Sequence, residues 1–189
     1  MGKLIYTHMV SLDGFIETDK PYDGENWAIA NDELTRHFLD FEAAIEAHLY
    51  GRRVFEAVAA GWPNFAKQPG MPPLVVEYAN LWINKPKVVF STTLDHVDWN
   101  ARLVKEGAAE EVAMLKASTA KALTLYGSVL AASLIEHQLV DELCFYINPV
   151  LLNSGVPVVA PLTKLVRLRL DTTETFGCGV VMLRYTCLY

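Results

Sequence analysis

The hydrophobic positions of this chain alternate between short β-rich runs and longer stretches with helical spacing. Four runs predict buried strands, at residues 4–10, 47–50, 87–90 and 123–126. Helical spacing predicts helices from Asp32 onward and at 52–58, 74–82, 108–118 and 129–137. The first of them follows Asn31, a residue type that caps helices, and its apolar face is predicted to hold Leu34, Phe38, Phe41 and Ile45. Residues 61–73 contain four prolines and are predicted to form a loop.

This alternation of strands and helices predicts an α/β fold. Right-handed crossovers place helices on both faces of a sheet with a parallel core. The last third differs, because residues 140–150, 164–175 and 180–189 are β-rich with no helical segment between them. We therefore expect the sheet to finish with antiparallel strands. A length of 189 residues without repeats or linkers predicts a single domain over residues 1–189.

Composition and charge exclude several classes of protein. The net charge is −6 and the basic residues are scattered, which argues against a nucleic-acid-binding protein. The three cysteines include no CxxC pair, so neither a disulfide framework nor a zinc site is predicted, and the five histidines lack metal-ligand spacing. No continuous apolar stretch has the roughly 18 residues that a membrane helix needs. We expect a cytoplasmic protein without metal or membrane contacts.

Glycine or hydroxyl residues follow three of the predicted strands, as Gly51-Arg52-Arg53, Ser91-Thr92-Thr93 and Gly127-Ser128. Ligands of open α/β sheets lie outside the carboxyl ends of the strands, and helix N-termini suit phosphate. A nucleotide site is one interpretation; ordinary turns are the other. Arginines at a helix N-terminus oppose the helix dipole unless an anion lies there too, although Glu56 could pair with one of them across a helical turn.

Four motifs in order resemble a known family. SLDGFIE follows the first strand, LYGRRVFEAV the second, VVFSTTL lies at the third, and LTLYGSVLAASLIEHQLVDEL precedes NPVLLNSGVPV. Together they resemble the reductase domain of riboflavin biosynthesis, which has the dihydrofolate-reductase-like fold. The resemblance covers nearly the whole chain and implies a three-layer α/β/α sandwich with a mixed, mostly parallel sheet that binds NADPH.

The resemblance also implies which residues contact the cofactor. Residues 13–17 would form a loop over the nicotinamide, which backbone groups of Met9 and Val10 would line. Phosphate contacts fall on Gly51, Arg52 and Arg53, and contacts to the adenosine ribose 2′-phosphate fall on Ser91 and Thr92. The pyrophosphate turn would comprise Tyr126, Gly127 and Ser128, followed by Val129. Members of this fold have a cis peptide in that turn, which here would precede Gly127.

Substrate contacts are less firmly indicated by the motifs. In dihydrofolate reductases an acidic residue at the start of the first helix protonates the substrate, and the position that matches it here is Asp32, with Glu33 beside it and Trp27 shortly before. Both carboxylates could equally be ordinary first-turn residues that the helix dipole favours. The arginine that holds the glutamate tail of folate in dihydrofolate reductases aligns near Lys85. A lysine cannot make the bidentate contact of a guanidinium group, so folate is a poor candidate substrate. No second basic cluster is evident for a ribosyl phosphate. Trp27, Trp62 and Tyr22 could border a pocket or pack as core or lid residues.

The sequence is compatible with two functions. One is an NADPH-dependent reductase that transfers hydride to a small heterocyclic or carbonyl substrate, such as a riboflavin precursor or a pteridine. The alternative is a non-catalytic nucleotide-binding or oligomeric module that retains the fold. In both cases the apolar strands near the C-terminus predict a homodimer, because an apolar sheet edge is normally paired or covered.

Overall fold

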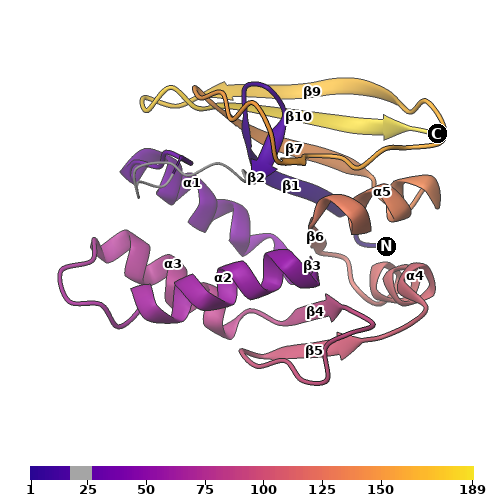
Figure 1. Ribbon diagram of the computed structural model, residues 1–189, viewed down its shortest axis with the longest axis horizontal. Coiled ribbons are helices and arrows are strands. Elements are labelled where there is room, and N and C mark those ends of the chain that lie inside the picture. Colours follow the sequence, from indigo (N-terminus) through magenta and orange to yellow (C-terminus); the bar gives the residue numbers. More distant parts are fainter. Residues whose placement is uncertain (18–26) are drawn as a thin grey trace.

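The computed structural model describes residues 1–17 and 27–189 and confirms the α/β fold. Its main sheet has eight strands in the order β5-β4-β3-β6-β1-β7-β10-β9 (Figure 1). Six strands run parallel: β1 (Leu4–Ser11), β3 (Ile45–Gly51), β4 (Lys87–Phe90), β5 (Ala101–Val104), β6 (Ala122–Tyr126) and β7 (Glu142–Asn148). Strand β10 (Val181–Leu188) is antiparallel to both β7 and β9 (Arg167–Thr175). A small second sheet pairs β2 (Phe15–Glu17) with β8 (Val156–Pro157).

Helices cover both faces of the main sheet. One layer comprises α1 (Asp32–Ala43), α2 (Arg52–Phe65) and α3 (Pro73–Asn84), and the other comprises α4 (Ala108–Ser118) and α5 (Ser128–Glu136) (Figure 1). Leu34 of α1 packs with Ile5 of β1, whereas Val112 of α4 packs with Leu4, the neighbouring residue of the same strand. Alternation along the strand therefore supplies a core to each helical layer. No helix of the described ranges is long and apolar enough to cross a membrane.

Two sequence expectations about the elements were wrong. Helix α2 continues to Phe65 through Pro63, where a loop was predicted. Trp62 of this last turn packs against Tyr78 of α3, with ring centroids 4.9 Å apart, and this burial offsets the cost of a proline inside a helix. Ile45 opens β3 and does not lie on the preceding helix. The sheet finishes with antiparallel strands, as expected. Strand β7 still pairs in parallel with β1, and the antiparallel direction begins at β10.

Sheet order decides which loops meet. Strands β3, β6 and β1 are consecutive neighbours and parallel, so their carboxyl ends lie at one edge of the sheet. Gly51, Gly127 and the loop after Ser11 are thereby brought together from distant parts of the chain. Asp13 of that loop accepts hydrogen bonds from the N–H groups of Leu152 and Asn153, at 3.1 and 2.7 Å, which fixes the loop against the segment after β7.

Candidate functional site

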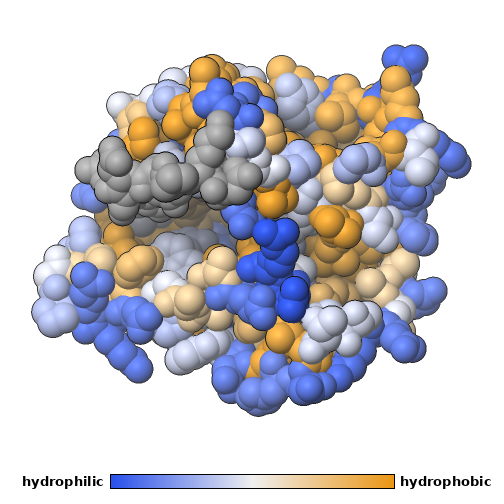
Figure 2. Space-filling view, in the orientation of Figure 1, coloured by the Kyte–Doolittle hydropathy of each residue, from blue (hydrophilic) through white to orange (hydrophobic). Residues whose placement is uncertain are grey.

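A cavity of about 680 Å³ opens beside these strand ends. Residues of β1, α1, α2 and α3 line it, and Figure 2 shows the hollow between α1 and the α2–α3 pair. Aromatic side chains dominate its walls and include Trp27, Phe38, Phe41, Trp62, Tyr78 and Tyr146. Concave, largely apolar sites of this size are typical of small-molecule pockets. The cavity is therefore the candidate active site.

A buried polar chain supports one wall of the cavity. The indole N–H of Trp82 donates to the Tyr50 hydroxyl at 3.0 Å, and that hydroxyl lies 3.2 Å from Nδ1 of His48. Nε2 of His48 lies 2.8 Å from the carboxylate of Glu42, and Nζ of Lys85 lies 3.3 Å from it. One set of protons satisfies every contact: His48 is neutral, receives from Tyr50 and donates to Glu42.

The charges of these hydrogen-bonded side chains follow from their surroundings. Burial disfavours an ionised Glu42, but the hydrogen bond from His48 and the nearby positive charge of Lys85 outweigh burial and hold the pKa of Glu42 below its usual value. Burial also lowers the pKa of His48, despite the neighbouring carboxylate. Lys85 donates to the carbonyls of Glu42 and Ile45, at 2.8 and 3.0 Å. This lysine is thus committed to the protein interior and does not replace a folate-binding arginine.

Two helix N-termini meet next to the cavity. Gly51 precedes α2 and Gly127 precedes α5, and neither helix has a side-chain cap. A Cβ added to Gly127 would lie 3.4 Å from the backbone nitrogen of Gly51, so the two turns approach closely. The hydroxyl of Ser128 is buried and has no hydrogen-bond partner among the described residues. Adjacent N–H groups and an unsatisfied hydroxyl fit an anion such as a phosphate.

The two arginines of α2 complete this arrangement. Nε of Arg52 lies 3.9 Å from Glu56, and Nη2 of Arg53 lies 3.3 Å from Glu17. The pairing of Arg52 with Glu56 is the alternative left open by the sequence. Both pairs are exposed and contribute little stability, so an incoming phosphate can replace them. Figure 2 shows hydrophilic side chains next to the hollow.

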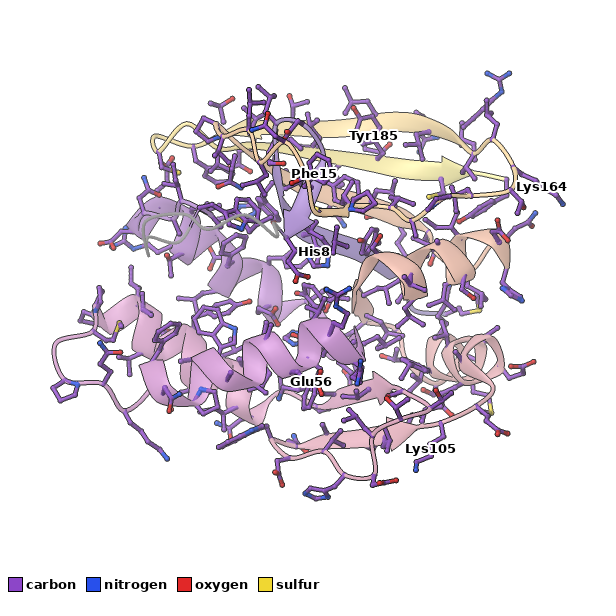
Figure 3. All side chains as sticks on the ribbon, viewed as in Figure 1. His8, Phe15, Glu56, Lys105, Lys164 and Tyr185 are labelled. Atoms are coloured by element: carbon purple, nitrogen blue, oxygen red, sulfur yellow. The ribbon has the colours of Figure 1, made fainter. Side chains whose placement is uncertain are left out.

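His8 on β1 holds the Gly127 turn in place. Its Nε2 accepts a hydrogen bond from the Gly127 N–H at 3.0 Å, and its ring packs edge to face against Tyr126. Burial lowers the pKa of His8 to about 4, so the ring is neutral and can accept this bond at ordinary pH. Figure 3 shows His8 between β1 and α2. The described backbone contains no cis peptide, so the cis bond implied before Gly127 is not present.

The other predicted cofactor residues lie in different surroundings. Met9 lines the cavity, whereas the side chain of Val10 is buried and does not. The Ser91 hydroxyl accepts from the N–H groups of Thr93 and Leu94, at 3.2 and 3.1 Å, so Ser91 caps its own turn. Thr92 is exposed beside it. Val129 is 76% exposed on α5.

The predicted acids lie outside the described lining of the cavity. Asp32 is exposed and lies 3.7 Å from Nη2 of Arg36, and Glu33 accepts a hydrogen bond from the Gly177 N–H at 2.8 Å. Of the predicted aromatic residues, Trp27 and Trp62 line the cavity, and Tyr22 falls outside the described residues.

Sequence patterns missed several residues of the site. Tyr146 lines the cavity from β7, and its hydroxyl lies 3.0 Å from Nε2 of His37 on α1. His8, Glu42 and Tyr78 are also lining residues. No spacing in the sequence connects these positions, because β7 reaches β1 only through the order of the sheet. Polar residues inside otherwise apolar strands, such as His8, were the one available signal.

Relatives in sequence and structure agree with this architecture. Protein YyaP of Bacillus subtilis (strain 168), which is uncharacterized, is 34% identical over 185 residues, covering 97% of this chain and 94% of YyaP. A Shewanella sp. PV-4 protein assigned to riboflavin biosynthesis superposes with a TM-score of 0.76 at 21% identity, covering 99% of both chains. Dihydrofolate reductase from Enterococcus faecalis, complexed with NADP(H), superposes with a TM-score of 0.58 at 14% identity, covering 98% of this chain and 95% of that one.

A third structure is a diaminohydroxyphosphoribosylaminopyrimidine deaminase/5-amino-6-(5-phosphoribosylamino)uracil reductase from Thermotoga maritima. It superposes with a TM-score of 0.63 at 13% identity, covering 99% of this chain and 57% of that one. These likenesses confirm the predicted dihydrofolate-reductase-like fold. The family model of the RibD C-terminal domain matches residues 2–182. The chain therefore belongs to the RibD C-terminal domain family.

Proposed function

We propose that this protein is an NADPH-dependent reductase that transfers hydride to a small heterocyclic or carbonyl substrate. The observation that carries the proposal is the pair of uncapped helix N-termini after Gly51 and Gly127, with Arg52 and Arg53 in the first turn of α2, directly beside an aromatic cavity. The fold shared with a dihydrofolate reductase that holds NADP(H) also supports it.

Each part of the site has a distinct task in this reaction. The N–H groups at the starts of α2 and α5, together with Arg52 and Arg53, would hold the cofactor phosphates. Met9 and Thr7 of β1 line the cavity where the nicotinamide and substrate would meet. When bound, NADPH supplies the hydride. The aromatic walls exclude water from the reacting atoms and fix the relative orientation of the two rings.

A proton must follow the hydride onto the substrate. Tyr146 lies next to Met9 in the register of β1 and β7, and it lines the cavity. Burial raises the pKa of Tyr146 above its usual value, so its hydroxyl stays protonated. It can donate to the substrate and be reprotonated from His37, whose Nδ1 lies 3.6 Å from the partly exposed Glu174. We propose Tyr146 as the proton donor beside the earlier candidate Asp32, whose role stays a prediction.

A titration with NADPH and NADH tests the cofactor part of the proposal. NADPH should bind more tightly, because Arg52, Arg53, Ser91 and Thr92 offer charge and hydroxyl groups to a 2′-phosphate. The double variant Arg52→Ala with Arg53→Ala should weaken NADPH binding by about 2 kcal/mol, or about 30-fold in Kd. The control double variant Arg102→Ala with Arg167→Ala, far from α2 in the chain, should bind normally. Equal affinity for both cofactors, or an unchanged titration in the first variant, would contradict the placement.

Hydride transfer separates an enzyme from a non-catalytic module. A module that only retained the fold would bind NADPH but oxidise it with no heterocyclic or carbonyl compound. Screening such compounds for loss of NADPH absorbance distinguishes the two. An enzyme is favoured by the Tyr146–His37 contact at 3.0 Å, because it places a donor hydroxyl at the cavity wall with a route to the surface.

A further inference from the structure

The walls of the cavity are built to hold a flat ring. Trp62 and Tyr78 lie with ring centroids 4.9 Å apart, and Phe38 and Tyr146 pack edge to face at 4.8 Å. Rings that contact one another in this way keep a fixed orientation and offer faces and edges on which an aromatic ligand stacks. The cavity wall therefore selects planar aromatic molecules by shape.

Positive charge is scarce in the same cavity. Among the described lining residues, Arg53 is the only lysine or arginine. It is exposed and already lies beside Glu17. Under the proposed function Arg53 contacts a phosphate of the cofactor. The described lining then offers no further cation to a substrate phosphate or carboxylate.

The nearest buried lysines cannot supply that cation. Lys85 donates to two main-chain carbonyls and faces Glu42. Lys87 donates to the carbonyls of Lys85 and Trp99, each at 2.8 Å. Turning either ammonium group into the cavity would leave buried carbonyl oxygens without partners, which is unfavourable. Both lysines are structural cations.

The remaining polar groups of the cavity suit a neutral ligand. Glu42 is paired with Lys85, so the pair adds no net positive charge to the cavity, and burial raises the pKa of Tyr78 and of Tyr126 well above the usual value, so both hydroxyls stay neutral. Neutral hydroxyls match the carbonyl and N–H groups of a heterocycle. A phosphate placed here would lose its hydration without gaining a charged partner.

We infer that the substrate is an uncharged, planar heteroaromatic molecule that carries neither a phosphate nor a carboxylate. This inference rests on the proposed function, since it assigns Arg53 to the cofactor. It separates this chain from the Thermotoga maritima protein, which is named as a reductase of a phosphoribosyl compound. The shared fold thus holds a different class of substrate in this chain.

Riboflavin and flavin mononucleotide form a matched pair of probes, because they differ only by one phosphate. Quenching of flavin fluorescence is measured with the full chain in the presence of saturating NADP⁺, which occupies the proposed phosphate site. A second series uses the variant Arg52→Ala with Arg53→Ala and no NADP⁺. In both series riboflavin should bind at least about tenfold more tightly than flavin mononucleotide. Equal or tighter binding of flavin mononucleotide, or quenching of neither flavin, overturns the inference.

An added cation should reverse the preference. Ala57 is exposed and lines the cavity, so Ala57→Arg should tighten binding of flavin mononucleotide about tenfold while leaving riboflavin unchanged. Ala60→Arg, exposed on the same helix and outside the described lining, is the control and should change neither affinity. No gain in Ala57→Arg, or the same gain in Ala60→Arg, contradicts the inference. Failure of NADP⁺ to bind contradicts the proposed function alone, because the second series still reports the preference between the flavins.

Discussion

Replacing Gly127 by alanine tests whether the turn before α5 is built for close approach. Gly127 has φ 111° and ψ 121°, a conformation that residues with a Cβ rarely adopt. Backbone strain of this kind costs about 1–3 kcal/mol. The new Cβ would lie 3.4 Å from the nitrogen and 3.5 Å from the Cα of Gly51, at ordinary van der Waals distance, so the penalty comes from the backbone conformation while the methyl group fills the space between the two turns. Gly127→Ala should therefore destabilise the fold and also displace the turn that faces the cofactor.

Gly70→Ala is the matched control. Gly70 also has a positive φ, of 82°, but its added Cβ would meet nothing within 4 Å. Both variants carry the backbone penalty, and only Gly127→Ala carries the contact with Gly51. A loss of about 1–3 kcal/mol corresponds to a fall in Tm of about 2–12 °C for a chain of this length. Gly127→Ala should show at least the fall of Gly70→Ala.

The cofactor titration provides the second measurement. Gly127→Ala should raise the Kd for NADPH, measured below the Tm of the variant, whereas Gly70→Ala should leave it unchanged. An unchanged Tm in Gly127→Ala would refute the strain argument. A lowered Tm with an unchanged Kd would show that the turn is structural and does not approach the cofactor.

Three further results are expected. Burial lowers the pKa of His8 to about 4, so the unfolded chain takes up a proton before the folded chain as the pH falls. The free energy of unfolding, measured by urea titration, should therefore drop by about 3 kcal/mol between pH 6.5 and 4. His8→Gln should lack this part of the pH dependence, and an identical pH profile in that variant would exclude His8 as its cause. In single-turnover hydride transfer, Tyr146→Phe should slow the reaction about 100-fold or more, whereas Asp32→Asn should have little effect; the opposite order would return the proton donor to Asp32. Every residue of edge strand β9 is exposed, including Leu168 and Leu170, so we expect a homodimer that covers this strand. The double variant Leu168→Lys with Leu170→Lys should be a monomer in light scattering. A monomeric unsubstituted protein would contradict the dimer.

The sequence by itself determined most of the helices and buried strands and the edge of the sheet that carries the site. Strand and helix periodicities are local signals, because the spacing of apolar residues over a few neighbouring positions indicates which face of the element is buried. Asn31 indeed caps α1, accepting a hydrogen bond from the Leu34 N–H at 2.9 Å. Glycines after strands likewise marked the two turns that meet beside the cavity. Parallel strands, which the alternation of strands and helices implies, place both turns at the same edge of the sheet, and the strand order, which sets β3 beside β6, brings them into contact.

Only the tertiary structure decided which side chains form the cavity. Tyr146 reaches His37 because β7 pairs with β1, and Trp82 reaches Tyr50 because α3 packs near β3. Such contacts depend on strand order and helix packing, which no local spacing encodes. The course of α2 through Pro63 has the same origin, since contact of Trp62 with Tyr78 outweighs a local signal for a loop. The motifs placed the phosphate end of the site, whereas the substrate end depends on packing between distant elements.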